Sequence, residues 1–175
     1  MVVLGPYYSH TLMNALLSHS IRWGRADPTT HELLKAYDNG MLFARHSRDL
    51  VFDEVRRGAC TIPTIQTLLL LSAQECSLGN STQAWLYSGM AFRLVDHLGV
   101  SFDVQRNGPS VTLSDEDIEI RRRLFWSCYF WDKIISLYLG RLPSLQQTPV
   151  SPPQWIREFP KVYAVFSCNT LADNA

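Results

Sequence analysis

The sequence predicts an all-α fold, a bundle of helical hairpins packed around one long, aromatic-rich helix. Apolar residues recur at helical spacing through most of the 175-residue chain, and no stretch alternates in the manner of a strand. Glycines stand where the periodic segments end, at residues 24, 58, 79, 99 and 140. The length fits one domain.

Two helices are expected in the first third of the chain. Residues 8–23 carry Leu12 and Leu16 on one helical face, and residues 31–57 are also helical in character. Asp27 followed by Pro28 is a turn and capping signal before the second helix, which a break near Asn39 and Gly40 divides.

The next two helices, residues 63–78 and 81–98, are predicted to form an antiparallel hairpin because only a few residues join them. The first is apolar on more than one side and should be buried between neighbours. The second carries a ridge of small side chains that would let another helix approach closely, at Ala84, Ser88, Ala91 and Val95.

The long helix is predicted over residues 114–139, with Ser114 as its cap and Gly140 as its stop, a length of roughly 39 Å. Its aromatic residues spread around most of the circumference, which places it in the middle of the bundle. Its polar positions concentrate in one sector, at Arg122, Asp132, Lys133 and Ser136.

We expect one domain over residues 1–150, followed by an irregular tail over residues 151–175. Residues 100–112 are expected to form a polar loop that contains Asn107-Gly108-Pro109. The prolines from Pro143 onward interrupt regular structure, and the last stretch is weakly patterned.

Charge and cysteine content limit the function classes. Sixteen basic and sixteen acidic residues give no overall basic excess of the kind expected of a nucleic-acid-binding module. The four cysteines are far apart and form no Cys-x-x-Cys pair, which predicts reduced thiols in an intracellular protein. The apolar run 124–139 is interrupted by charges and is too short to span a membrane, and the N-terminus lacks a signal peptide, so a soluble chain is predicted.

No constellation of catalytic or metal-ligating residues is found. The five histidines have no ligand spacing, and neither a phosphate-binding loop nor a nucleophile elbow occurs. The sequence therefore predicts no enzyme, and no catalytic, cofactor-binding or metal-binding residue. Asn80-Ser81-Thr82 matches a glycosylation acceptor, but its place between two helices favours a role in the turn.

Two features of the long helix have a functional and a structural interpretation. Arg121, Arg122 and Arg123 could contact nucleic acid, but consecutive helical residues fan out by about 100° each, which favours scaffold arginines that pair with acids or stack on rings. A small-molecule pocket could form among the aromatic rings, although such density is more often core, at Phe125, Trp126, Tyr129, Phe130 and Trp131.

Two blocks of sequence resemble the fungal-specific transcription factor domain, also called the xylanolytic-activator type of regulatory domain. The first is IQTLLLLSAQECSLGNSTQAWLYSGMAFRLVDHLGV, and the second is EIRRRLFWSCYFWDKIISLYLGRLP. A weaker third block is YYSHTLMNALLSHSIRWG near the N-terminus. The motif positions, which we interpret as structural, are Arg121, Arg122, Arg123, Trp126, Asp132, Gly140 and Arg141. Leu142 departs from the usual Gly-Arg-Pro. Residues 150–175 do not resemble the family's further helices, which predicts either a truncated domain or an unusual gene product.

The resemblance implies the regulatory middle domain of a zinc binuclear-cluster transcription factor, acting in the nucleus through contacts with co-regulators, other domains of the same factor or a metabolite. Such factors bind DNA through a separate six-cysteine cluster that holds zinc, and this chain has no such cluster. We therefore expect no cofactor here, no membrane contact, and DNA binding only through that other domain. The alternative is a helical-repeat-like interaction scaffold, although no second copy of the hairpin recurs at the required spacing.

Overall fold

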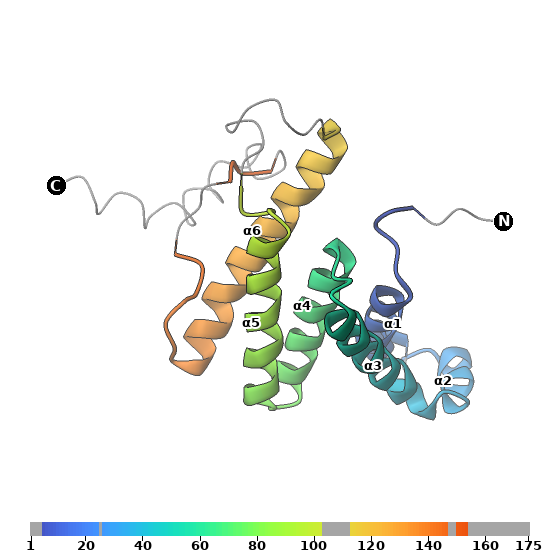
Figure 1. Cartoon of the computed structure of the whole chain (residues 1–175). Coiled ribbons are helices and arrows are strands. Elements are labelled where there is room, and N and C mark those ends of the chain that lie inside the picture. Colours follow the sequence, from blue (N-terminus) through green and yellow to red (C-terminus); the bar gives the residue numbers. More distant parts are fainter. Residues whose placement is uncertain (1–4, 25, 103–112, 147–149, 154–175) are drawn as a thin grey trace.

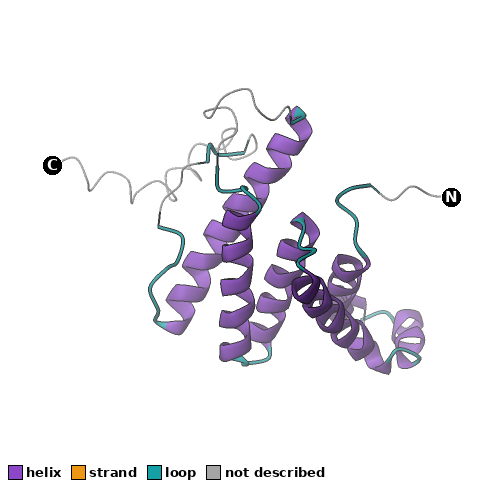
Figure 2. Ribbon diagram, in the orientation of Figure 1, coloured by secondary structure: helices purple, strands orange, loops and turns teal. Residues whose placement is uncertain are grey.

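The computed structural model describes residues 5–24, 26–102, 113–146 and 150–153, and all regular structure within them is helical (Figures 1 and 2). The predicted all-α class is confirmed. The elements in chain order are α1 (His10–Gly24), α2 (Pro28–Lys35), the 3-10 turn η1 (Asp38–Gly40), α3 (Met41–Arg57), α4 (Ile62–Ser77), α5 (Ser81–His97) and α6 (Asp115–Leu139).

Helices begin and end at the residues that local chemistry favours. The Asp27 carboxylate accepts a hydrogen bond of 2.8 Å from the backbone N–H of Thr30 and so caps α2. The Ser114 hydroxyl accepts one of 3.1 Å from the backbone N–H of Asp117 at the start of α6. Gly140 ends α6 in the left-handed conformation, with a φ of 63°.

The break predicted within residues 31–57 is present at η1, which separates α2 from α3. Asn39 and Gly40 both have positive φ there, at 51° and 89°. A Cβ atom on residue 40 would lie 1.9 Å from the Cδ1 atom of Ile21 in α1. Glycine therefore allows the chain to turn and lets α1 pack closely against the start of α3.

The α4–α5 hairpin is confirmed, and its two helices lie side by side in Figure 1. The predicted small ridge of α5 faces inward: Ala84, Ser88, Ala91 and Val95 are all fully buried. The hydroxyl of Ser72 in α4 donates a hydrogen bond of 2.7 Å to the backbone carbonyl of Ala84. Small side chains let the two backbones come close enough for this bond.

The most enclosed helix is α4 rather than α6. It contacts α1, α3, α5 and α6, whereas α6 packs mainly on α5 and α4 and lies at one side of the bundle (Figure 1). The sequence explains this difference from the predicted central position of α6. The only charged side chain of α4 is Glu75, which is itself buried, so α4 can be surrounded by other helices at little cost.

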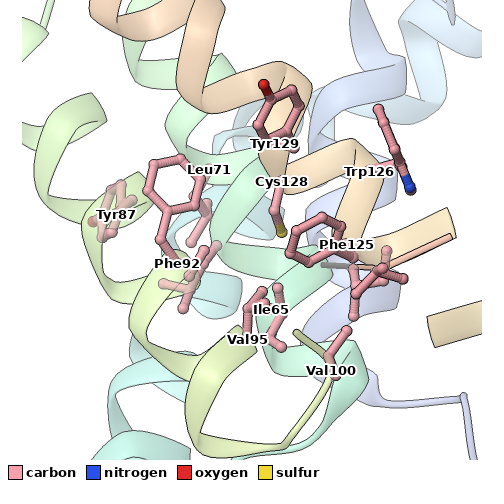
Figure 3. Close-up of a cluster of buried hydrophobic side chains, with 14 of the residues drawn as sticks. Ile65, Leu71, Tyr87, Phe92, Val95, Val100, Phe125, Trp126, Cys128 and Tyr129 are labelled. Atoms are coloured by element: carbon pink, nitrogen blue, oxygen red, sulfur yellow. The ribbon is translucent and has the colours of Figure 1, made fainter. Parts of the chain in front are cut away.

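The core forms where α4, α5 and α6 meet (Figure 3). Helix α6 contributes Phe125, Trp126, Cys128 and Tyr129, and the other two helices contribute mainly aliphatic side chains. Phe125 and Tyr129 stack with ring centroids 6.4 Å apart and an interplanar angle of 20°. These rings therefore pack the interior of the domain.

The chain after α6 folds back along it (Figure 1, orange). We call residues 140–146 and 150–153 the strap. Val150 of the strap is only 4% exposed and belongs to the core. Most of the predicted tail and of the 100–112 loop lies outside the described residues, so the domain boundary at residue 150 stays a prediction.

Candidate functional site

The distinctive residues of α6 hold the surrounding chain in place. The Arg121 guanidinium donates a hydrogen bond of 3.2 Å to the backbone carbonyl of Leu98, the residue that ends α5. Arg123 pairs with Glu119 one turn earlier, at 2.9 Å. Both arginines therefore act within the scaffold, as their fanning along the helix predicts.

Two further motif residues fasten the strap to α6. The indole N–H of Trp126 donates a hydrogen bond of 3.3 Å to the backbone carbonyl of Ser151. The buried carboxylate of Asp132 accepts hydrogen bonds from the backbone N–H groups of Ser144 and Leu145. Part of the predicted polar sector of α6 therefore faces the strap. The strap supplies the hydrogen-bond donors that a buried carboxylate requires.

Cations in this region stack on aromatic rings. The Arg141 guanidinium lies 4.8 Å from the ring centroid of Trp85 in α5, and the Lys133 ammonium lies 4.4 Å from the ring centroid of Tyr129. Lys133 also lies 3.4 Å from a carboxylate oxygen of Asp132. Arg141 in the strap thereby joins the end of α6 to α5.

A second buried carboxylate lies at the hairpin turn. Glu75 is 1% exposed and pairs with Arg48 of α3 at 3.1 Å. The side-chain amide of Asn80 donates a hydrogen bond of 2.7 Å to its other oxygen. Asn80 therefore acts in the turn between α4 and α5, and it occupies the N-cap position of α5 without a side-chain capping bond.

In the described part of the chain, Phe125, Trp126 and Tyr129 are packed in the core, as the structural interpretation of the aromatic cluster predicts. A cavity of about 420 Å³ lies instead on the aliphatic side of the same helix, between α1, α4 and the N-terminal half of α6. Sequence reasoning missed it because its apolar lining comes from three separate helices, at Leu12, Leu16, Leu69, Leu70, Ile120 and Leu124.

The polar residues in the lining of this cavity are Gln66, Arg123 and Ser127. The side chains of Gln66 and Ser127 differ in their hydrogen bonding. The Ser127 hydroxyl donates a hydrogen bond of 2.8 Å to the backbone carbonyl of Arg123. The side-chain carbonyl oxygen of Gln66, in contrast, is buried and has no hydrogen-bond partner in the part of the chain that is described. An unmet acceptor of this kind is uncommon in a folded protein.

The solvent-facing side of α6 is apolar in its C-terminal half. We call the exposed residues of this half the outer face of α6: Phe130, Ile134, Leu137 and Tyr138. Leu137 is 86% exposed and Tyr138 is 62% exposed. Contiguous apolar surface of this kind is typical of regions that contact another protein.

Neither a metal centre nor a reactive thiol is found among the described residues. No group of histidine, cysteine and acidic side chains there could hold a metal ion, so the zinc of a binuclear cluster finds no fitting site in this part. Burial raises the pKa of the Cys128 thiol far above its usual range, with a smaller contribution from the negative charge of Asp132. Along the described helices, no segment has the length and apolar content needed to cross a bilayer.

Comparison with known proteins adds the family to this geometry. The profile of the fungal specific transcription factor domain matches residues 6–160. The chain belongs to the fungal specific transcription factor domain family. The match includes all the described helices. The Arg-Arg-Arg-x-Phe-Trp motif of α6 therefore belongs to this domain, and its Arg121 and Trp126 contact the end of α5 and the strap. The Gly-Arg motif after α6 belongs to it as well, and its Arg141 contacts α5.

Several curated proteins are similar to this fungal specific transcription factor domain. The nitrogen assimilation transcription factor nit-4 of Neurospora crassa is 29% identical over 85% of this chain and 13% of its own length. The nitrogen assimilation transcription factor nirA of Emericella nidulans is 33% identical over 81% of this chain and 16% of its own length. An uncharacterised transcriptional regulatory protein of Schizosaccharomyces pombe is 37% identical over 93% of this chain and 26% of its own length. The chain thus spans between 13% and 26% of the length of these relatives, and no solved structure matches it.

Proposed function

We propose that this chain is the regulatory middle domain of a fungal zinc-cluster transcription factor and acts in the nucleus. The observation that carries the proposal is the family match over residues 6–160, together with relatives that are named as transcription factors or transcriptional regulators. The matched region is a small part of each relative, and a regulatory module within a longer factor fits that proportion.

The domain controls transcription through contacts with other domains of the factor, with co-regulators or with a metabolite. The apolar side chains on the outer face of α6 support protein contacts, because such surface is costly to leave in water. DNA is bound by the separate zinc cluster of the factor and not by this domain. The guanidinium groups of Arg121 and Arg123 bind partners within the domain, which supports a structural role for them rather than DNA binding.

We also propose that the domain is not an enzyme and needs no cofactor of its own. Among the described residues, the two buried carboxylates bind structural partners: Asp132 binds the strap, and Glu75 binds Arg48 and Asn80. Catalytic acids and bases, by contrast, have geometry that leaves them open to a substrate.

A tethering experiment tests the regulatory role. The 175-residue chain is inserted between a heterologous DNA-binding domain and an activation domain in yeast, and reporter output is measured. We expect the chain to change the output, and we expect Trp126→Ala, which disrupts the core, to abolish that change. Leu33→Ala on α2, where Leu33 is 66% exposed, is the matched control. Equal output from the chain and from an unrelated helical domain of the same length would contradict the proposal.

A further inference from the structure

The exposed residues of α6 have the spacing of a surface on which another helix packs. We propose that the outer face of α6 binds the same face of a second copy of this chain, in an antiparallel and reversible dimer. This inference deepens the proposed regulatory function by naming one partner of the domain. It rests on that function for its biological meaning, but its test does not depend on transcription.

The spacing of the exposed residues indicates that the partner is a helix. In the second half of α6 the exposed side chains follow one another at intervals of three, four and three residues, at Ser127, Phe130, Ile134 and Leu137. Alternating intervals of three and four place side chains along one line of a helix, where the side chains of a second helix fit between them. Two helices packed in this way cross at a shallow angle of about 20°. The face therefore suits another long helix.

The charges of the chain favour another α6 as that helix. Every exposed residue between Leu124 and the end of this fully described helix is uncharged, so two identical faces do not repel each other. A partner helix with charges along its contact line would leave them against hydrocarbon side chains, which is costly. The chain also carries sixteen basic and sixteen acidic residues, and a net charge near zero removes the long-range repulsion between copies. Because α6 lies at one side of the bundle in Figure 1, a second molecule can approach it.

The antiparallel orientation follows from the charge at the start of α6. The first turn of this helix is acidic, at Asp115, Glu116 and Asp117. A parallel pair would bring the two acidic turns together and align the two helix dipoles, and both effects oppose association. In an antiparallel pair centred on Ile134, each acidic turn lies beyond the last turn of the other α6.

This antiparallel pair also matches large side chains across the interface. The two copies of Ile134 meet at the two-fold axis, and residues at equal distances from it on opposite sides face each other. Phe130 then lies opposite Tyr138 of the second copy, an aromatic pair that packs favourably edge to face. Leu137 lies opposite the half-buried Trp131 of the second copy. Each large side chain of the outer face therefore gains an apolar neighbour.

The exposed area indicates that the dimer is weak. Phe130 is 45% exposed, Ile134 38%, Leu137 86% and Tyr138 62%. With roughly 200 Å² for each fully exposed large side chain, these fractions amount to about 450 Å² per chain. Two copies would bury about 900 Å² through them, which is less than the roughly 1,200–2,000 Å² of stable complexes and within the range of transient ones. We therefore expect a dissociation constant on the order of tens to hundreds of micromolar.

Sedimentation equilibrium of the full 175-residue chain under reducing conditions tests the dimer. Between about 10 µM and about 1 mM we expect a reversible shift from monomer to dimer. Leu137→Glu places a charge within the contact and should raise the dissociation constant at least about tenfold. Because Leu137 is largely exposed in the single chain, this variant should keep the circular dichroism spectrum and the melting temperature of the dilute original chain.

A matched control and a second variant locate the contact. Leu33→Glu makes the same substitution at a leucine of α2 that is 66% exposed, and it should leave the dissociation constant unchanged. Tyr138→Lys introduces a charge of the opposite sign on the outer face and should weaken the dimer as Leu137→Glu does. It keeps the test decisive if Leu137→Glu loses helix content.

A disulfide test checks the antiparallel register. The two copies of residue 134 meet at the axis, so Ile134→Cys should form a cross-linked dimer when a mild oxidant is added. The two copies of residue 137 lie about 9 Å apart along the helix axis, beyond the roughly 7 Å between Cα atoms that a disulfide can bridge. Leu137→Cys should therefore cross-link no faster than the original chain, which controls for the natural cysteines.

Three outcomes would overturn the proposal. A chain that stays monomeric up to about 1 mM would show that the outer face of α6 serves a different partner. A dimer that Leu137→Glu and Tyr138→Lys leave unchanged would place the contact on another surface, such as the exposed apolar residues of α1. Rapid cross-linking of Leu137→Cys would show a parallel pair. The reporter experiment on the transcriptional role is read independently of these results, so the two proposals fail separately.

Discussion

The carboxylate of Asp132 accepts a hydrogen bond of 3.0 Å from the backbone N–H of Ser144, a residue of the strap. The other carboxylate oxygen accepts one of 2.8 Å from the N–H of Leu145. Asp132 is fully buried, and its charge is balanced by Lys133 at 3.4 Å. One side chain of α6 therefore holds two consecutive amides of an otherwise irregular segment.

Asp132→Asn should lower the free energy of unfolding by about 2–4 kcal/mol. Asparagine keeps one acceptor oxygen, but its amide nitrogen would face a backbone N–H, and Lys133 would lose the negative charge beside it. Urea unfolding followed by circular dichroism measures the change. Asp49→Asn, at an exposed position of α3, is the control and should change stability by less than about 0.5 kcal/mol. Equal effects of the two substitutions would contradict the anchoring role of Asp132.

Trp126→Ala should destabilise the domain by about 3–5 kcal/mol, because it removes a large side chain that is 6% exposed together with its hydrogen bond to Ser151. Trp126→Phe keeps most of the packing and should cost clearly less. Thermal and urea unfolding of both variants check the order. An unchanged melting curve for Trp126→Ala would show that this part of α6 does not belong to the core.

Two positions near the end of α6, one buried and one exposed, should differ in how much a substitution by glutamine lowers the stability of the domain. Ile135 is fully buried, so Ile135→Gln should cost at least about 2 kcal/mol through lost packing and a buried amide. Leu137 is 86% exposed, so Leu137→Gln should leave stability within about 0.5 kcal/mol of the original. Comparison of urea midpoints tests the assignment of the outer face, and a large loss for Leu137→Gln would show that this face is covered.

The buried thiol of Cys128 should make stability fall at alkaline pH. Its pKa in the folded chain is raised far above the ordinary value of 9.0, chiefly by burial. The stabilisation of the neutral thiol is thus complete below about pH 9 and is lost as pH rises further, since only the unfolded chain then releases the proton. Between pH 8 and pH 10 the original chain should lose about 1–2 kcal/mol more than Cys128→Ala. Parallel urea curves under reducing conditions at each pH measure this difference, and identical pH profiles would refute it.

Local chemistry made much of the helical framework predictable. The caps at Asp27 and Ser114 and the stop at Gly140 act within a few residues of themselves, so the sequence alone indicates them. The small ridge of α5 was equally visible, because side-chain size at helical spacing does not depend on the partner. Family membership followed from motif order and was confirmed by the comparison with known proteins.

Long-range polar contacts were not predictable in the same way. A buried glutamate and an exposed one look identical in a sequence. Glu75 meets Arg48 from another helix, and Glu54 bridges Thr11 of α1 and Thr64 of α4. The cavity could not be predicted for the same reason. Its lining comes from α1, α4 and α6, and the sequence of one helix does not show that a gap remains between three of them. The position of α4 as the most enclosed helix likewise depends on topology.

The strap has a consequence for the order in which the domain assembles. The strap is held by side chains of α6 and by core contacts rather than by regular backbone hydrogen bonding of its own. It therefore cannot adopt its native position before α6 has formed and placed Asp132 and Trp126 on the same side of the helix. The strap should therefore be among the last segments to join the native structure and among the first to leave it. Amide exchange at Ser144 and Leu145 would report on that detachment while the hairpin of α4 and α5 remains closed.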